Sequence, residues 1–168
     1  MIRLVTVIVL VGLLAVTAAL SMLGIQSDAR KSTLNSIAST MHTTSEIVHT
    51  KAIVNSLTEA CYIYQDETTL RAFIEGIYIC NGYPTAHIDN VKRAFNISDD
   101  LEVNNRMKDG GRIAYVSFKK VTYISDEENK LVTVTPKCYV SYQDAKRANG
   151  PEIYDVKVEL EDCYKNRA

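Results

Sequence analysis

The stretch GLLAVTAALSMLGIQSDARKSTL, residues 12–34, starts as an apolar run and ends as a charged segment, with no proline between the two parts. The apolar part begins earlier, because the 22 residues from Leu4 to Ile25 include no formal charge. At about 1.5 Å per residue this segment is roughly 33 Å long as a helix, enough to cross a hydrocarbon core of about 30 Å. We therefore expect residues 1–27 to form a transmembrane helix.

A cleaved secretory signal is the alternative for this segment. Arg3 would supply a minimal basic region, and Val16, Thr17 and Ala18 offer small residues at a plausible cleavage site. However, the apolar region of a signal peptide runs to about 7–15 residues and is not normally continued by an amphipathic helix. The sequence therefore favours a retained helix.

The charged part that follows continues the helical pattern. Leu34, Ile37, Met41 and Val48 fall on one stripe at helical spacing, and no proline occurs before about residue 55. A single helix from Leu4 through a continuation at residues 28–55 is the simplest reading. Because an apolar stripe must be buried, we expect these four residues to form the core of a head by covering one face of a sheet.

The rest of the chain predicts an α+β fold with an antiparallel sheet. Residues 56–110 read as a loop region with short helices at 68–76 and 88–95, and with a turn at Gly82-Tyr83-Pro84. Residues 111–168 change to a period of two, clearest at 153–160, where Tyr154, Val156, Val158 and Leu160 share one face. Strands are predicted at 112–118, 121–125, 130–135, 138–143 and 153–160.

Four cysteines lie beyond the apolar segment: Cys61, Cys80, Cys138 and Cys163. An even number in a small domain is typical of disulfides formed outside the cytoplasm, and no CxxC spacing indicates a zinc or redox site. Three pairings are possible, and we adopt the local one, Cys61 with Cys80 and Cys138 with Cys163, as a hypothesis. Their oxidation would place residues 28–168 outside the cytoplasm.

Composition and motifs exclude several classes of function. The chain has 168 residues and a net charge of −1, which does not favour nucleic-acid binding. It has no GxSxG, P-loop or HExxH motif, so we expect neither enzymatic activity nor a cofactor.

Three groups of side chains could in principle bind a metal. His42, Glu46 and His49 share a flank of the helix at i, i+4 and i+7, but a solvated flank or a subunit contact explains them better than a metal site without further ligands. Residues 126–129 (DEEN) and 99–102 (DDLE) supply clustered oxygens for calcium, yet neither has the spacing of an EF-hand. We read both as charged turns and predict no metal site.

The amino-terminal sequence LVTVIVLVGLLAVTAALSMLGIQSDARKSTL resembles the first helix of type IV pilins, most closely the mannose-sensitive haemagglutinin (MSHA) pilin group. GYPTA at 82–86, CYVSY at 138–142 and the late Cys163 are similar to the central loop and the cysteine-bounded terminal region of that group. The similarity runs from about Leu4 to Cys163.

The resemblance implies a structural subunit that polymerises into a helical pilus used for surface attachment. The subunit would wait in the inner membrane, be extracted by the pilus assembly machinery and pack its apolar helix into the core of an extracellular filament. Homo-oligomeric packing would then use residues 1–27, with small residues such as Gly12 and Ala15 allowing close approach. Gly12 and Gly24 are the places where the helix could locally melt in the filament. Residues 28–168 would form the globular head.

Two positions depart from the family pattern. Arg3 stands where pilins have a glutamate that pairs with the amino-terminal charge of a neighbouring subunit, and Leu20 stands where many have a proline. Arg3 would invert the charge used in assembly. A minor pilin, a type II secretion pseudopilin, or a membrane-anchored periplasmic binding module that does not polymerise therefore remain alternatives.

Overall fold

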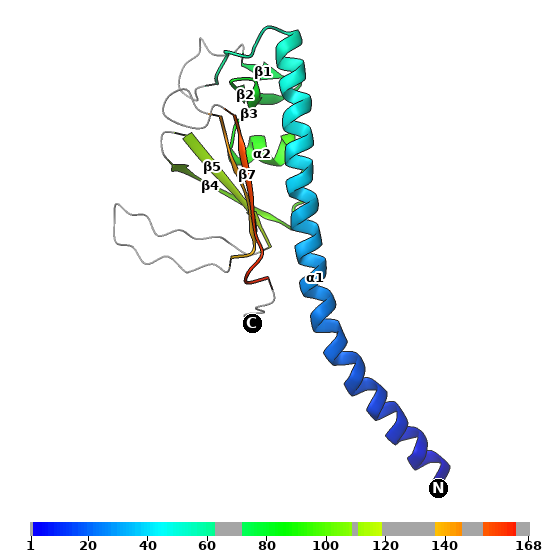
Figure 1. Cartoon of the computed structure of the whole chain (residues 1–168). Coiled ribbons are helices and arrows are strands. Elements are labelled where there is room, and N and C mark those ends of the chain that lie inside the picture. The colour runs from blue at the N-terminus through cyan, green and yellow to red at the C-terminus, as the bar shows by residue number, and fades with distance from the viewer. Residues whose placement is uncertain (1, 63–71, 109–110, 119–136, 146–152, 164–168) are drawn as a thin grey trace, which may run out of the picture.

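The computed structural model describes residues 2–62, 72–108, 111–118, 137–145 and 153–163, without the side chains of residues 2–5, 13–24 and 108. This part of the chain is α+β, with a long amino-terminal helix beside two antiparallel sheets (Figure 1). The predicted strands at 121–125 and 130–135, and the charged turn at 126–129, lie outside the described residues.

Helix α1 runs without interruption from Ile2–Val54, as the lack of proline predicted. It ends in a hydrogen-bonded cap: the N–H of Leu57 donates to the Ala52 carbonyl at 2.8 Å, and the N–H of Ser56 donates to the Ile53 carbonyl at 3.0 Å. Ser56 has the positive φ of 56° that this type of cap requires. Only the carboxy-terminal part of α1 lies beside the head, and the amino-terminal part extends away from it (Figure 1).

The larger sheet has the antiparallel order β4-β5-β6-β7. Its strands are β4 (Glu102–Lys108), β5 (Gly111–Ser117), β6 (Tyr139–Gln143) and β7 (Asp155–Glu159). The last three match predicted strands, but β4 corrects the prediction of a loop up to residue 110. The run Asn104-Asn105-Arg106 has low strand propensity, and pairing with β5 along the whole of β4 overrides it.

The smaller sheet is the second correction to the predicted loop region. It joins β1 (Phe73–Ile74), β2 (Ile77–Cys80) and β3 (Tyr83–Pro84) through the two-residue turns Glu75-Gly76 and Asn81-Gly82. All four turn residues have positive φ, as in the turns whose twist matches a hairpin. The helix predicted at 68–76 is therefore wrong over residues 73–76, and residues 68–71 lie outside the described chain.

Helix α2 (Ile88–Ala94) confirms the helix predicted at 88–95. The buried Asn90 side chain fastens it to the smaller sheet: Nδ2 donates to the carbonyls of Tyr78 and Thr85, both at 2.9 Å. Its Oδ1 accepts the Tyr78 N–H at 2.8 Å. One amide therefore fixes α2 against the hairpin.

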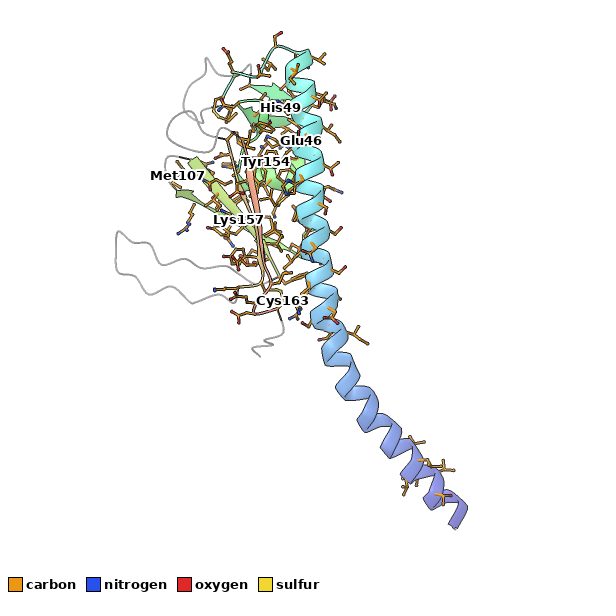
Figure 2. The ribbon with its side chains drawn as sticks, viewed as in Figure 1. Glu46, His49, Met107, Tyr154, Lys157 and Cys163 are labelled. Atoms are coloured by element: carbon orange, nitrogen blue, oxygen red, sulfur yellow. A yellow bond between two sulfur atoms is a disulfide. The ribbon has the colours of Figure 1, made fainter. Side chains whose placement is uncertain are left out.

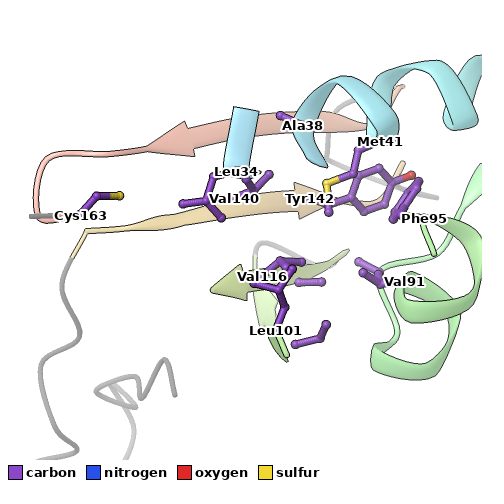
Figure 3. Close-up of a cluster of buried hydrophobic side chains, with 13 residues drawn as sticks. Leu34, Ala38, Met41, Val91, Phe95, Leu101, Val116, Val140, Tyr142 and Cys163 are labelled. Carbon is purple, nitrogen blue, oxygen red and sulfur yellow. The ribbon is translucent and has the colours of Figure 1, made fainter. Parts of the chain in front are cut away.

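The apolar stripe of α1 is buried in two separate clusters. Leu34 and Met41 are fully buried against the larger sheet, near Val116, Val140 and Tyr142 (Figure 3). Ile37 is partly buried in the same cluster. Val48 instead packs with Ile74 and Ile79 of the smaller sheet, so the four residues do not cover a single sheet as predicted. The predicted inward face of β7, with Tyr154, Val156, Val158 and Leu160, packs against the first cluster.

The structure pairs Cys61 with Cys80 and Cys138 with Cys163. The first bridge ties the segment after α1 to β2, and the second links the residue before β6 to the segment after β7. This is the local pairing adopted from the sequence, and each bridge limits the freedom of the unfolded chain.

Candidate functional site

The surface that most needs a partner is the amino-terminal part of α1. Val7, Ile8, Val9, Leu10 and Val11 are 54–63 % exposed. Because successive residues of a helix differ by about 100° around its axis, five consecutive apolar residues cover its whole circumference. A helix that is apolar all round is normally buried, and no described part of the head lies beside this one (Figure 1).

The predicted assembly residues fall mostly outside the described side chains. This applies to Arg3, Leu4, Ala15, Leu20 and Gly24, whose backbone nevertheless belongs to α1. The space beside the Gly12 Cα atom is open, because a Cβ atom placed there would have no neighbouring atom within 4 Å. In the part of the chain that the structure describes, no helix meets the length and apolarity needed to cross a membrane.

The flank of α1 that carries His42, Glu46 and His49 is a contact with the head. The Tyr154 hydroxyl donates to Glu46 Oε1 at 3.0 Å, and its oxygen lies 3.2 Å from His42 Nδ1 (Figure 2). Burial, followed by the hydrogen bond to Glu46, raises the pKa of Tyr154 from 10.0 to about 12, so this phenol stays a hydrogen-bond donor. Among the described residues no group of three His, Cys, Asp or Glu side chains could hold a metal.

His49 has a packing role at the smaller sheet. Its ring stacks on Tyr83 with centroids 4.3 Å apart and an interplanar angle of 4°. Gly82 makes this approach possible, because its φ is +81° and a Cβ there would lie 2.7 Å from His49 Nδ1. The turn predicted at Gly82-Tyr83-Pro84 lies one residue earlier, at Asn81-Gly82, and Tyr83 and Pro84 form β3. Asn-Gly is the local signal of such a hairpin.

The acidic run at 99–102 forms a turn. The Ser98 hydroxyl donates to Asp100 Oδ2 at 3.3 Å and accepts from the Asp100 N–H at 3.4 Å. Leu101 is buried in the first cluster and Glu102 is the first residue of β4, so only the start of the run lies in the turn. The second acidic run, at 126–129, lies outside the described residues.

Asp144 is a buried carboxylate that the sequence reasoning did not single out. It follows β6 and accepts the N–H of Arg112 at 2.7 Å and the N–H of Ala86 at 3.3 Å. These bonds join the larger sheet to the segment between β3 and α2. Burial raises the pKa of Asp144 above its usual 3.8, although the two hydrogen bonds and Arg112 oppose the shift.

Asp144→Ala should destabilise the head by about 1–3 kcal/mol, because it leaves two backbone N–H groups without an acceptor. A raised pKa means that Asp144 stabilises most when protonated, below pH 3.8, and that this contribution is lost as the pH rises through the raised pKa. The difference in unfolding free energy between wild type and variant should thus narrow with rising pH. Urea titrations from about pH 4 to about pH 7 measure it, and a difference that widens with pH would contradict this account.

Among the described parts of the chain, residues 7–11 are therefore the longest consecutive run of exposed apolar side chains, whereas the polar flank of α1 and Asp144 serve the packing of the head. Comparison of the chain with protein-family models, curated proteins and solved structures finds no match.

Proposed function

We propose that this chain is a type IV pilin-like structural subunit, which polymerises into an MSHA-like pilus used for surface attachment. The observation that supports it best is the exposure of residues 7–11 on a helix that extends beyond the head. Burying apolar surface away from water is favourable by about 25 cal/mol per Å², so we expect these side chains to lie in an apolar environment.

Two apolar environments would serve this helix in succession. Its backbone N–H and C=O groups are bonded within the helix, so it can lie in a bilayer or in a bundle of identical helices. In our proposal the chain first sits in the inner membrane with residues 28–168 outside the cytoplasm. The assembly machinery then extracts it into the extracellular filament, where homotypic packing of residues 1–27 replaces lipid.

The head would be the displayed part of the filament. Two buried clusters pack it against α1, and two disulfides cross-link segments within it, which suits a subunit exposed outside the cell. The segments closed by Cys61–Cys80 and Cys138–Cys163 are the parts we assign to surface attachment. The proposal includes neither a catalytic activity nor a cofactor.

Arg3 favours a second candidate, a minor pilin or a pseudopilin of a secretion system. A basic side chain in place of the family glutamate suits a subunit incorporated at low copy or at the tip. The two candidates share the fold and differ in abundance within the filament.

Intact-mass spectrometry of sheared extracellular filaments tests the proposal. A major subunit should dominate that fraction and be about 4 Da lighter than its reduced form, because two disulfides are closed. A trace amount would favour the minor subunit. A chain that stays in the membrane fraction, and that keeps its role when residues 4–25 are replaced by an unrelated spanning segment, would instead be an anchored module.

A further inference from the structure

Helix α1 carries very few charges in its amino-terminal half. Arg3 and Asp28 are 25 residues apart, and no charged residue lies between them. If residues 4–25 are packed among other helices, the guanidinium of Arg3 needs a carboxylate, because an unpaired charge is costly in apolar surroundings. In the whole of α1 the acidic residues are Asp28 and Glu46.

Of these two carboxylates, Asp28 is the one available to another chain. Its side chain is exposed, and among the residues that the structure describes it makes no ion pair. Glu46 instead accepts a hydrogen bond from Tyr154 of the head. The charge pattern therefore matches Arg3 with Asp28.

The side of α1 that faces away from the head has no charge from residue 29 to residue 54. Its exposed residues recur at intervals of three, four or seven: Ala29, Ser32, Ser36, Thr43, Ile47 and Val54. Of the charged residues in this range, Lys51 and Glu46 contact the head, since Lys51 pairs with Glu75 and Glu46 accepts a hydrogen bond from Tyr154, and Arg30 and Lys31 are half-buried. We call these six residues the outward side; most of them are small, which would let another helix approach closely.

Resting on the filament proposed above, we propose that Arg3 of one copy pairs with Asp28 of a second copy. Residues 4–25 of the first helix then lie along residues 29–50 of the second, parallel to it and shifted by about 37 Å. This shift brings the exposed residues 7–11 beside Ser32 and Ser36. The contact joins two different surfaces, so it can repeat along a filament.

A cycle of neutral variants tests this register. Arg3→Gln and Asp28→Asn should each lower the amount of subunit in sheared filaments by about tenfold, because each leaves one charge unpaired. The double variant should return to within about twofold of wild type, since neither charge remains. The matched control combines Arg3→Gln with Glu46→Gln, which neutralises the other acidic residue of α1 without changing its size. The amount of this variant in sheared filaments should stay as low as that of Arg3→Gln alone.

A photo-crosslinking residue at position 7 of the otherwise unchanged chain gives a second readout. It should capture residues 29–36 of another copy. Capture near residue 24 would indicate antiparallel helices and overturn the proposal, as would a double variant no better than the single ones. If the wild-type chain forms no filaments at all, the proposed function itself fails. If filaments form but the double variant does not recover, or position 7 does not capture residues 29–36, only the proposed alignment of Arg3 with Asp28 is overturned.

Discussion

Replacing Val9 with Asp is expected to remove the chain from extracellular filaments while the head keeps its fold. Val9 lies in the middle of the exposed apolar residues 7–11 and belongs to neither buried cluster. A carboxylate at the centre of an apolar helix environment costs about 2.5–3.5 kcal/mol. Subunit recovered from sheared filaments should therefore fall at least tenfold, roughly the effect of 1.4 kcal/mol in an equilibrium.

The matched control is Ile153→Asp on the head. Ile153 is 57 % exposed and Val9 is 54 % exposed, so both variants place an Asp at a β-branched apolar position of similar exposure in the isolated chain. Ile153→Asp should leave filament yield unchanged, and closed disulfides should report a folded head in both variants. Normal filament yield from Val9→Asp would refute the assembly role of residues 7–11.

The long helix and the burial of its second half were predictable from the sequence. Residues 4–25 lack charge, and Leu34, Met41 and Val48 then recur at helical spacing, so both patterns depend only on local order along the chain. The burial of all three residues follows from that spacing. The sequence did not indicate that Val48 would meet a second sheet, because which surface covers a stripe depends on the topology of the rest of the chain.

The strands that were missed have two different causes. For the smaller sheet a local signal existed, since Asn-Gly is the strongest short-range sign of a hairpin and stands at residues 81–82. Strand β4 has no such local signal. Its two asparagines and Arg106 are held in a strand by pairing with β5, which the local sequence does not reveal.

The contacts between α1 and the head show the limit of sequence reasoning for the site. The hydrogen bond from Tyr154 to Glu46 joins residues 108 positions apart. A helical flank of His42, Glu46 and His49 suggests a metal site, a solvated surface or a subunit contact when read alone. In the structure its partners are Tyr83 of β3 and Tyr154, the residue before β7. Charge and spacing located the flank but could not identify what it contacts.

Tyr142→Ala should be the most destabilising change in the head, by about 3–5 kcal/mol, the usual cost of deleting a large buried aromatic side chain. Tyr142 is fully buried, and its ring lies edge-on to Phe95 with centroids 4.8 Å apart (Figure 3). It also lies 5.8 Å from the ring of Tyr154, so the cavity would open where the sheet, α1 and α2 meet. Urea unfolding of the full chain in detergent, followed by circular dichroism, measures the loss.

Tyr142→Phe separates packing from hydrogen bonding at the same position. Burial raises the pKa of Tyr142 well above 10.0, so its hydroxyl is neutral and donates to the Pro84 carbonyl at 2.8 Å. Phenylalanine keeps the ring but leaves this carbonyl without that donor, and should cost about 1–3 kcal/mol. Because the larger part of the effect comes from the ring, Tyr142→Phe should retain most of the stability that Tyr142→Ala loses. Equal losses would mean that the bond to Pro84, and with it the link between the two sheets, contributes more than the aromatic packing.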